Sequence, residues 1–287
     1  MKKLHFVLLL TGAVALASCG GKTPPPAPTW SVCTGIENYP ALLEAGYDYI
    51  EPSVANLLMP AQSDSAFLMH REFVRSLDPK IISCTIFLPG QFRAVGPEAN
   101  HDDILEWAET TFSRARELDV PYIVFGSGRS RRVPDGFSRE EAKNQFIALC
   151  KRLGPAAAKY GVTVVVEPLN TGETNFINSL AEGAEIVEAT DHPNVRLLCD
   201  IFHMLREDEP ASEIVKYGSY IRHCHIAEKG NRTAPGMEPY DFTAYFDALK
   251  EIRYAGCISI EGSWGEGGMA SGLVAALEYM KGQYGVE

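Results

Sequence analysis

The chain has 287 residues, 46% of them hydrophobic, which is enough apolar material for one large domain with a sizeable core. Its formal net charge is −11 at pH 7, and its isoelectric point is about 5.2. Proteins that bind nucleic acids through the phosphate backbone carry a basic surface, so this charge disfavours a nucleic acid as partner.

The N-terminal segment is typical of an export signal. Two lysines precede a mostly apolar run over residues 6–16, which is too short to span a bilayer comfortably. The run ends in LASC at 16–19, which resembles the bacterial lipobox. We therefore expect residues 1–18 to be a lipoprotein signal peptide and Cys19 to be lipidated. Acyl chains would then attach the protein to the bacterial cell envelope, facing the periplasm or on the outer membrane. An ordinary secretory signal with an incidental cysteine is the alternative.

Residues 19–29 (CGGKTPPPAPT) are rich in proline, and we expect an extended, semi-rigid tether that contributes nothing to a core.

Six further cysteines follow, five of them in runs that read as buried strands. An oxidising envelope permits disulfides, but buried free thiols are the expected state. The six are Cys33, Cys84, Cys150, Cys199, Cys224 and Cys257.

From residue 30 onward, short apolar runs alternate with amphipathic stretches, which is the pattern of parallel strands joined by helices. Strands are predicted at 30–34, 47–52, 80–88, 121–126, 162–167, 195–201, 221–226 and 257–261. Helices are predicted at 39–45, 63–77, 101–118, 138–160, 179–190, 210–217, 241–252 and 270–281. Eight such pairs predict a single-domain (β/α)8 TIM barrel over residues 30–287. A doubly wound open sheet is the alternative, although no GxGxxG motif follows an early strand.

The last four predicted strands each end in a residue that could bind a metal: Glu167, Asp200, His225 and Glu261. In such a barrel the C-terminal strand ends form the active face, so four consecutive strands bring these side chains together at the mouth. On the seventh strand, His223 and His225 share one face. Because His225 is closer to the strand end, we expect it to be the ligand, with His223 supporting it.

This set of residues indicates a metal centre. Three neighbouring carboxylates repel one another at neutral pH unless a cation or a proton is shared between them. Three carboxylates and one imidazole suit a divalent ion, best Mn²⁺, with Mg²⁺, Co²⁺ or Zn²⁺ as alternatives. The ion would polarise a hydroxy-carbonyl compound and stabilise a cis-enediolate, with Glu167 and Glu261 as acid and base. For each acid, the competing interpretation is a cap on the following helix.

With these residues, the region 30–285 resembles the xylose-isomerase-like TIM barrels of the sugar isomerase/epimerase superfamily, above all the ketose 3-epimerases. The resemblance is strongest from residue 163 onward. It implies that Glu167, Asp200, His225 and Glu261 bind Mn²⁺ or a related ion. It also implies that Glu167 and Glu261 exchange the substrate proton.

Three further positions match substrate contacts of that family. Glu173 follows the first ligand by six residues, His203 gives the motif D-x-x-H, and Arg232 lies in the loop after the seventh strand. The resemblance implies that all three bind substrate. From the residues alone, His203 is equally explained as a solvated loop residue, and Arg232 as an exposed charge.

The segment 125–137 (FGSGRSRRVPDGF) follows the fourth strand and is rich in glycine and arginine. It is interpreted either as an anion site on the active face or as a solvated loop. Related isomerases carry a similar loop, which implies that Arg132 faces the substrate. Glu51, at the end of the second strand, is expected to cap the loop that follows.

The predicted function is a metal-dependent sugar isomerase or epimerase. An envelope location favours a free or oxidised sugar over a phosphorylated cytosolic metabolite. The main alternative is a lyase, dehydratase or eliminase that acts on a keto-sugar or keto-glycoside at the same metal. A non-catalytic sugar-binding lipoprotein would need that metal site to be lost, and an endonuclease IV-like enzyme would need more histidines on the early strands. The sequence leaves open whether the chain forms a homo-oligomer.

Overall fold

The computed structural model describes residues 25–238 and 240–286, so the predicted signal peptide and the lipidation site Cys19 lie outside the described residues. Within that part, eight parallel strands are arranged in the order β2-β1-β8-β7-β6-β5-β4-β3. Isolated parallel bridges between Ile50 and Ile81 and between Ser53 and Thr85 bring the two end strands together. The strands are β1 Thr29–Cys33, β2 Tyr49–Glu51, β3 Ser83–Cys84, β4 Tyr122–Phe125, β5 Thr163–Val166, β6 Val195–Asp200, β7 Ile221–Ile226 and β8 Cys257–Ile260.

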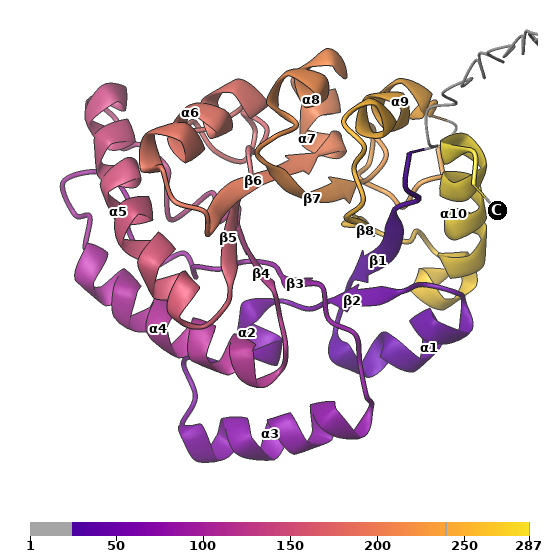
Figure 1. Cartoon of the computed structure of the whole chain (residues 1–287), viewed down its shortest axis with the longest axis horizontal. Coiled ribbons are helices and arrows are strands. Elements are labelled where there is room, and N and C mark those ends of the chain that lie inside the picture. Colours follow the sequence, from indigo (N-terminus) through magenta and orange to yellow (C-terminus); the bar gives the residue numbers. More distant parts are fainter. Residues whose placement is uncertain (1–24, 239, 287) are drawn as a thin grey trace, which may run out of the picture.

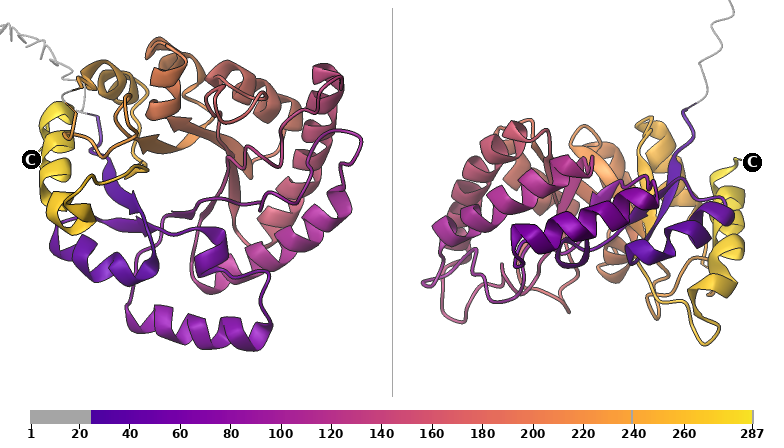
Figure 2. Two further views of the ribbon diagram at one scale, coloured as in Figure 1. Left: turned by 180° about the vertical axis from the view of Figure 1, so that it is seen from behind. Right: turned by 90° about the horizontal axis from the view of Figure 1, so that it is seen from below.

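Helices form an outer ring around these strands (Figure 1). They are α1 Tyr39–Glu44, α2 Val54–Leu57, α3 Asp64–Ser76, α4 His101–Glu117, α5 Arg139–Lys159, α6 Leu180–Thr190, α7 Ile201–Arg206, α8 Ser212–Tyr217, α9 Thr243–Glu251 and α10 Gly268–Tyr284, with a short 3-10 turn Ile36–Asn38. The predicted single-domain (β/α)8 barrel is confirmed, and the open-sheet alternative is wrong. The side view shows loops projecting from one end of the barrel (Figure 2).

Local sequence explains where the long helices begin. Ser63, Asn100, Ser138 and Ser179 each accept a backbone N–H of the first turn, which satisfies a donor that the helix itself leaves free. Ser138, for example, accepts from Glu141 N at 3.2 Å. The helices α2 and α7 were not predicted, because each is only one or two turns long and directly follows a strand.

Two apolar layers hold the barrel together. The larger layer lies between the strands and the helices. A smaller cluster of Val124, Val165 and Leu198 fills the barrel interior below the strand ends. Side chains along a strand alternate between these layers, so the residue two positions after an interior residue also faces the interior.

The described cysteines are free thiols, so packing and not disulfides holds this barrel together. Cys84, Cys150, Cys199, Cys224 and Cys257 are buried free thiols, as predicted, and Cys33 is a partly buried free thiol.

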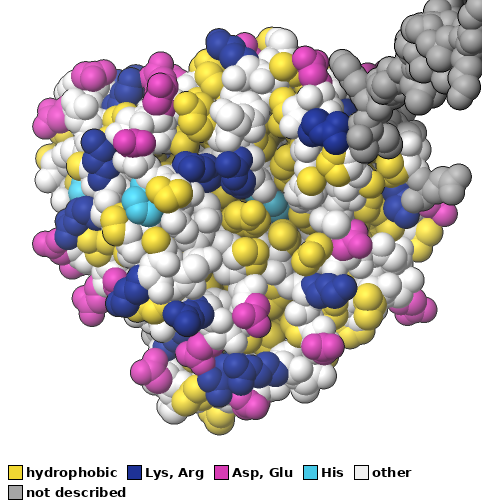
Figure 3. Space-filling model, viewed as in Figure 1, with side chains coloured by type: hydrophobic (Ala, Val, Ile, Leu, Met, Phe, Trp, Pro, Cys, Tyr) yellow, Lys and Arg dark blue, Asp and Glu magenta, His cyan; other side chains and the backbone are white. Residues whose placement is uncertain are grey.

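On the face in Figure 3, acidic and basic side chains are interspersed along the rim. Among the described residues, no helix combines the length and apolar character needed to cross a membrane.

The connection from β2 to α3 is held by one buried side chain. Arg114 of α4 is 4% exposed and donates to the carbonyl oxygens of Leu58 (3.1 Å), Met59 and Gln62 (2.9 Å) and to the carboxylate of Asp64 (2.8 Å). Since β2 and β3 are joined by isolated bridges and not by a continuous ladder, this clamp adds a tie between their connection and α4.

Replacing Arg114 by methionine keeps the apolar stem but leaves buried carbonyl oxygens without a donor. We expect Arg114→Met to lower the free energy of unfolding by about 2–4 kcal/mol. The measurement is urea denaturation followed by circular dichroism. Arg116→Met, on the exposed side of the same helix, is the control and should leave the midpoint nearly unchanged. Equal midpoints for the two variants would show that Arg114 is not a clamp.

Candidate active site

Strand periodicity brings the predicted ligands into the barrel interior. Val165 and Leu198 belong to the interior cluster, so Glu167 and Asp200, two residues later, face the same way. The parallel register sets Asp200 of β6 beside His225 of β7, and His225 beside Ser259 of β8. Glu261 follows Ser259 by two residues and therefore also faces the mouth.

The four predicted ligands form one cluster. One ligand atom from each of Glu167, Asp200, His225 and Glu261 lies within 4.8 Å of the others. His225 Nδ1 is 3.1 Å from Glu167 Oε1 and 3.5 Å from Glu261 Oε2. Asp200 Oδ2 is buried without a hydrogen-bond partner among the described residues. Three carboxylates, one imidazole and an unpaired buried oxygen fit a divalent ion with mainly oxygen ligands.

Asp200 also satisfies the competing interpretation, because it caps a helix. Its Oδ1 accepts from the backbone N–H groups of Phe202 (2.7 Å) and His203 (3.3 Å) at the start of α7. The cap occupies only that oxygen and leaves Oδ2 buried without a hydrogen bond among the described residues. Capping therefore fixes the orientation of the carboxylate instead of excluding it as a ligand.

The carboxylates differ in how firmly they hold a proton. Burial raises the pKa of Glu167 and raises the pKa of Asp200 to about 6. Burial also acts on Glu261, but His225 and Arg232 outweigh it and lower the pKa of Glu261 to about 2. The cluster therefore combines carboxyl groups whose pKa is raised with a carboxylate that is held ionised.

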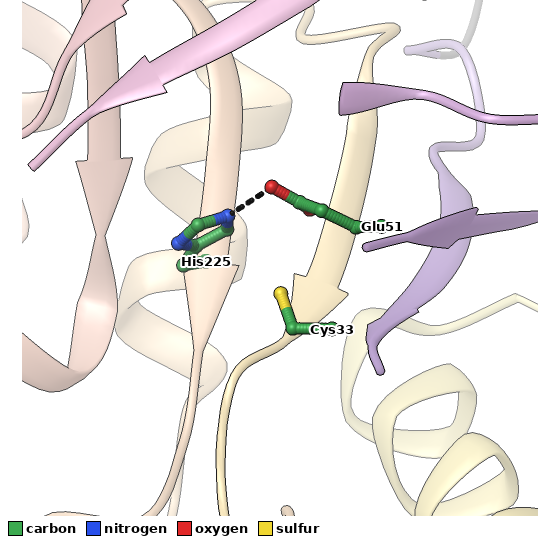
Figure 4. A group of neighbouring side chains, drawn as sticks. All are labelled: Cys33, Glu51 and His225. Atoms are coloured by element: carbon green, nitrogen blue, oxygen red, sulfur yellow. Dashed lines mark hydrogen bonds and ion pairs between the residues drawn. The ribbon is translucent and has the colours of Figure 1, made fainter. Parts of the chain in front are cut away.

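Glu51 supports the cluster from the opposite side of the barrel. It is completely buried, and its Oε1 lies 3.0 Å from His225 Nε2 (Figure 4). Its Oε2 lies 2.8 Å from His223 Nε2. A carboxylate accepts, so His225 donates through Nε2 and directs Nδ1 at Glu167 and Glu261. The predicted loop-capping role of Glu51 is wrong, since Ser53 caps α2.

His223, Ser83 and Cys33 lie around Glu51 in the barrel. His223 does not reach the cluster, because its Nε2 lies between Glu51 and Ser83 Oγ, 3.2 Å away. Cys33 lies beside Glu51 and His225 in Figure 4. The sequence signal for Glu51 was present: a short apolar run that ends in an acid, as in the strands that carry the ligands.

His203 presents a donor toward the cluster. Its Nδ1 accepts from the backbone N–H of Asn170 at 3.1 Å and lies 2.8 Å from Nδ2 of the Asn170 side chain. The ring proton is therefore on Nε2, which is buried and lies 3.4 Å from Asp200 Oδ2. Burial lowers the pKa of His203, so the ring is neutral.

Arg232 and Glu173 meet at the edge of the site. The Arg232 guanidinium donates to Glu173 Oε1 at 2.9 Å and to the Glu261 carboxylate, and it lies 4.6 Å from the centre of the Phe202 ring. Both residues line a cavity of about 430 Å³ that also contains Glu167 and Glu261. Two of the predicted substrate contacts thus face the same space as the two glutamates.

The arginine-rich loop is arranged differently from the prediction. Arg132 is exposed, donates to the Glu173 carbonyl oxygen at 3.0 Å, and is not among the residues that line the cavity, whereas Arg129 is. Arg131 is completely buried and donates to the Glu167 carbonyl oxygen at 2.6 Å, which fixes the end of β5. Adjacent arginines of one loop look alike in sequence, so their burial could not be read from it.

Gly126, at the end of β4, makes room for the first ligand. A methyl group at this position would lie 2.1 Å from Glu167 Oε2, closer than any real contact. Glycine is therefore needed here for space, because a side chain on the neighbouring strand would displace the carboxylate. The glycine thus allows the loop after β4 to approach a carboxylate of the chain itself.

Comparison with known proteins indicates the family to which this chain belongs. The family model described as xylose isomerase-like TIM barrel matches residues 40–283. An L-ribulose 3-epimerase of Methylomonas sp. (strain DH-1) is 29% identical over 239 residues, covering 81% of this chain and 79% of that protein. An L-ribulose 3-epimerase of Mesorhizobium japonicum is 30% identical over 228 residues, covering 76% and 72%.

The fold has the same relatives. The crystal structure of a 3-keto-D-glucoside 4-epimerase from E. coli superposes with a TM-score of 0.76 at 19% identity, covering 89% of this chain and 100% of that one. At that identity the likeness concerns the fold. The family model, by contrast, spans most of the barrel, including all four residues of the cluster. The chain therefore belongs to the xylose isomerase-like TIM barrel family.

Proposed function

We propose that the protein is a divalent-metal-dependent sugar epimerase or isomerase. The observation that carries this proposal is the cluster of Glu167, Asp200, His225 and Glu261 at the barrel mouth, with two of its carboxylates facing a cavity. The L-ribulose 3-epimerases among the relatives support a sugar as substrate and an epimerisation or isomerisation as reaction.

The four cluster residues would hold the ion, and Mn²⁺ suits them best, with Mg²⁺, Co²⁺ or Zn²⁺ as alternatives. When bound, it supplies Lewis-acid polarisation of the substrate carbonyl and compensates the charge of the carboxylates. His225 is prepared for this role, because Glu51 holds the Nε2 proton and Nδ1 faces the carboxylates.

Glu167 and Glu261 divide the proton transfer between them. They come from β5 and β8, on two sides of His225, and both line the cavity. Glu261 is held ionised by His225 and Arg232, which suits it to remove a proton from carbon. Burial raises the pKa of Glu167, so it holds a proton more readily than Glu261 and is better suited to return one from another direction. The roles exchange in the reverse reaction.

The carbon to which the proton is returned decides whether the product is an epimer or an isomer. Protonation of the same carbon from its other face gives an epimer, whereas protonation of the neighbouring carbon gives an isomer. We assign Glu173, His203 and Arg232 to substrate binding, because Glu173 and Arg232 line the cavity with the two glutamates and His203 lies against Asp200. Arg129 is better placed than Arg132 to meet a substrate group, since it lines the cavity. The lipobox-like residues 16–19 support a lipid-anchored enzyme in the cell envelope.

The proposal is tested with metal-loaded protein and a panel of keto-sugars and oxidised glycosides in D₂O. The expected product has the mass of the substrate plus one deuterium on a carbon beside the carbonyl. Loss of water or an alcohol would identify the lyase alternative. Absence of deuterium exchange across the panel, with Mn²⁺ or any of the other ions present, would contradict a proton-transfer enzyme.

Glu167→Gln and Glu261→Gln are each expected to lower kcat by about 10²–10⁴-fold, because each removes one proton carrier. Both variants should stay folded, and assays at saturating Mn²⁺ separate proton transfer from metal binding. The distinguishing readout is exchange without net reaction: each variant keeps deuterium exchange from one epimer and loses it from the other. Near-normal turnover by either variant would refute the assignment.

Glu51→Gln is expected to weaken Mn²⁺ binding about 10–100-fold, because the amide no longer fixes His225 with its Nδ1 lone pair toward the cluster. Calorimetric titration with Mn²⁺ measures this without any substrate. Glu173→Gln is the control, since it removes a negative charge at the same mouth from a residue outside the cluster. If both variants lost affinity equally, charge alone and not orientation would explain the effect.

A further inference from the structure

The barrel mouth holds two adjoining cavities. The first, of about 430 Å³, contains both catalytic glutamates, and the second, of about 660 Å³, extends over the ends of β1 and β2. They share Thr85, Ile86, Arg232 and Glu261 as walls. Each volume alone lies in the range of a small-molecule site, about 300–1,000 Å³. A single sugar ring in one cavity therefore leaves the other open to a second ligand unit.

The two cavities differ in chemistry. Only the first is lined by both Glu167 and Glu261, so it is where the reacting carbon lies. The second is lined largely by neutral hydroxyl and amide side chains, with the carboxylates of Glu51 and Glu261 among its walls. Its cationic residue is Arg232, which is already bonded to Glu173 and Glu261. The neutral side chains are Thr34, Ser53, Asn56, Asn231 and Ser263.

Such a lining suits an uncharged, hydroxylated ligand and not a phosphate, which would need a free cation or a cluster of them. Asn56 is exposed on α2, and within the described part of the chain its side-chain amide makes no hydrogen bond. Its donors and acceptor are therefore available to a ligand.

Ile86 separates the two cavities. Its φ is +56°, a left-handed conformation that β-branched residues rarely adopt, and its side chain is 56% exposed at the boundary. Strained backbone held at a cleft is characteristic of functional positions. The strain holds an apolar side chain where a link between two ligand units would pass.

We propose that the substrate is a neutral glycoside, with the keto-sugar ring in the first cavity and a second hydroxylated unit, joined through a glycosidic oxygen, in the second. This rests on the proposed function, since it names the substrate of the same site. The glycosidic bond passes beside Ile86, and Asn56 recognises the second unit.

The test compares a keto-glucose with the corresponding keto-glucosyl disaccharide on Mn²⁺-loaded protein. We expect kcat/KM to be roughly tenfold higher for the disaccharide, the effect of one or two added neutral hydrogen bonds. Asn56→Ala should remove most of this difference and leave the monosaccharide rate unchanged. Asn144→Ala, an exposed asparagine on α5 away from the mouth, is the matched control and should change neither rate.

An equal or higher kcat/KM for the monosaccharide would overturn the proposal, as would an Asn56→Ala variant that slows both compounds equally. Calorimetric binding of unoxidised glucose and of an unoxidised glucosyl disaccharide distinguishes it from the proposed function. Tighter binding of the disaccharide, lost in Asn56→Ala, supports the two-unit cleft even if nothing is turned over. Equal binding of the two sugars refutes it.

Discussion

Everything at the mouth of this barrel depends on the position of one imidazole ring. His225 lies between Glu51 on one side and Glu167 and Glu261 on the other, with a carboxylate within 3.1 Å of each ring nitrogen. Both nitrogens are engaged, so the ring cannot turn without breaking a buried contact. In the absence of a cation, Glu51 and the other acidic neighbours outweigh burial and raise the pKa of His225 well above its usual value. A bound metal would take the place of the Nδ1 proton.

Much of the fold and the cluster followed from the sequence, because both depend on periodicity. Buried parallel strands read as apolar runs, and an acid or histidine at the end of such a run is visible without coordinates. The eight strands and the convergence of Glu167, Asp200, His225 and Glu261 were predicted on this basis, and the structure contains both. The assignment of catalytic and ligand roles to these residues stays a proposal.

The parts of the fold and the site that could not be predicted do not follow the residue periodicity of helices or strands. The third strand was predicted at 80–88 but covers only Ser83–Cys84, because Ile86 adopts a left-handed conformation that ends the strand. Arg132 was expected at the substrate, yet the cavity is lined by Arg129, and Arg131 is buried against the Glu167 carbonyl. Three arginines within four residues can be assigned only when the path of the loop is known. Glu51 was misjudged because its partners, His223 and His225, lie more than 170 positions away in the sequence.

Glu51 has a mechanical consequence as well as a chemical one. It stands at the end of β2, whose outer edge meets β3 only through isolated bridges, and its carboxylate reaches across the barrel to β7. The carboxylate thus links the β2–β3 junction, where the strand pairing is interrupted, to the strand that carries His225. Because the same carboxylate bonds the imidazole, a displacement of the end of β2 would also displace the ring of His225.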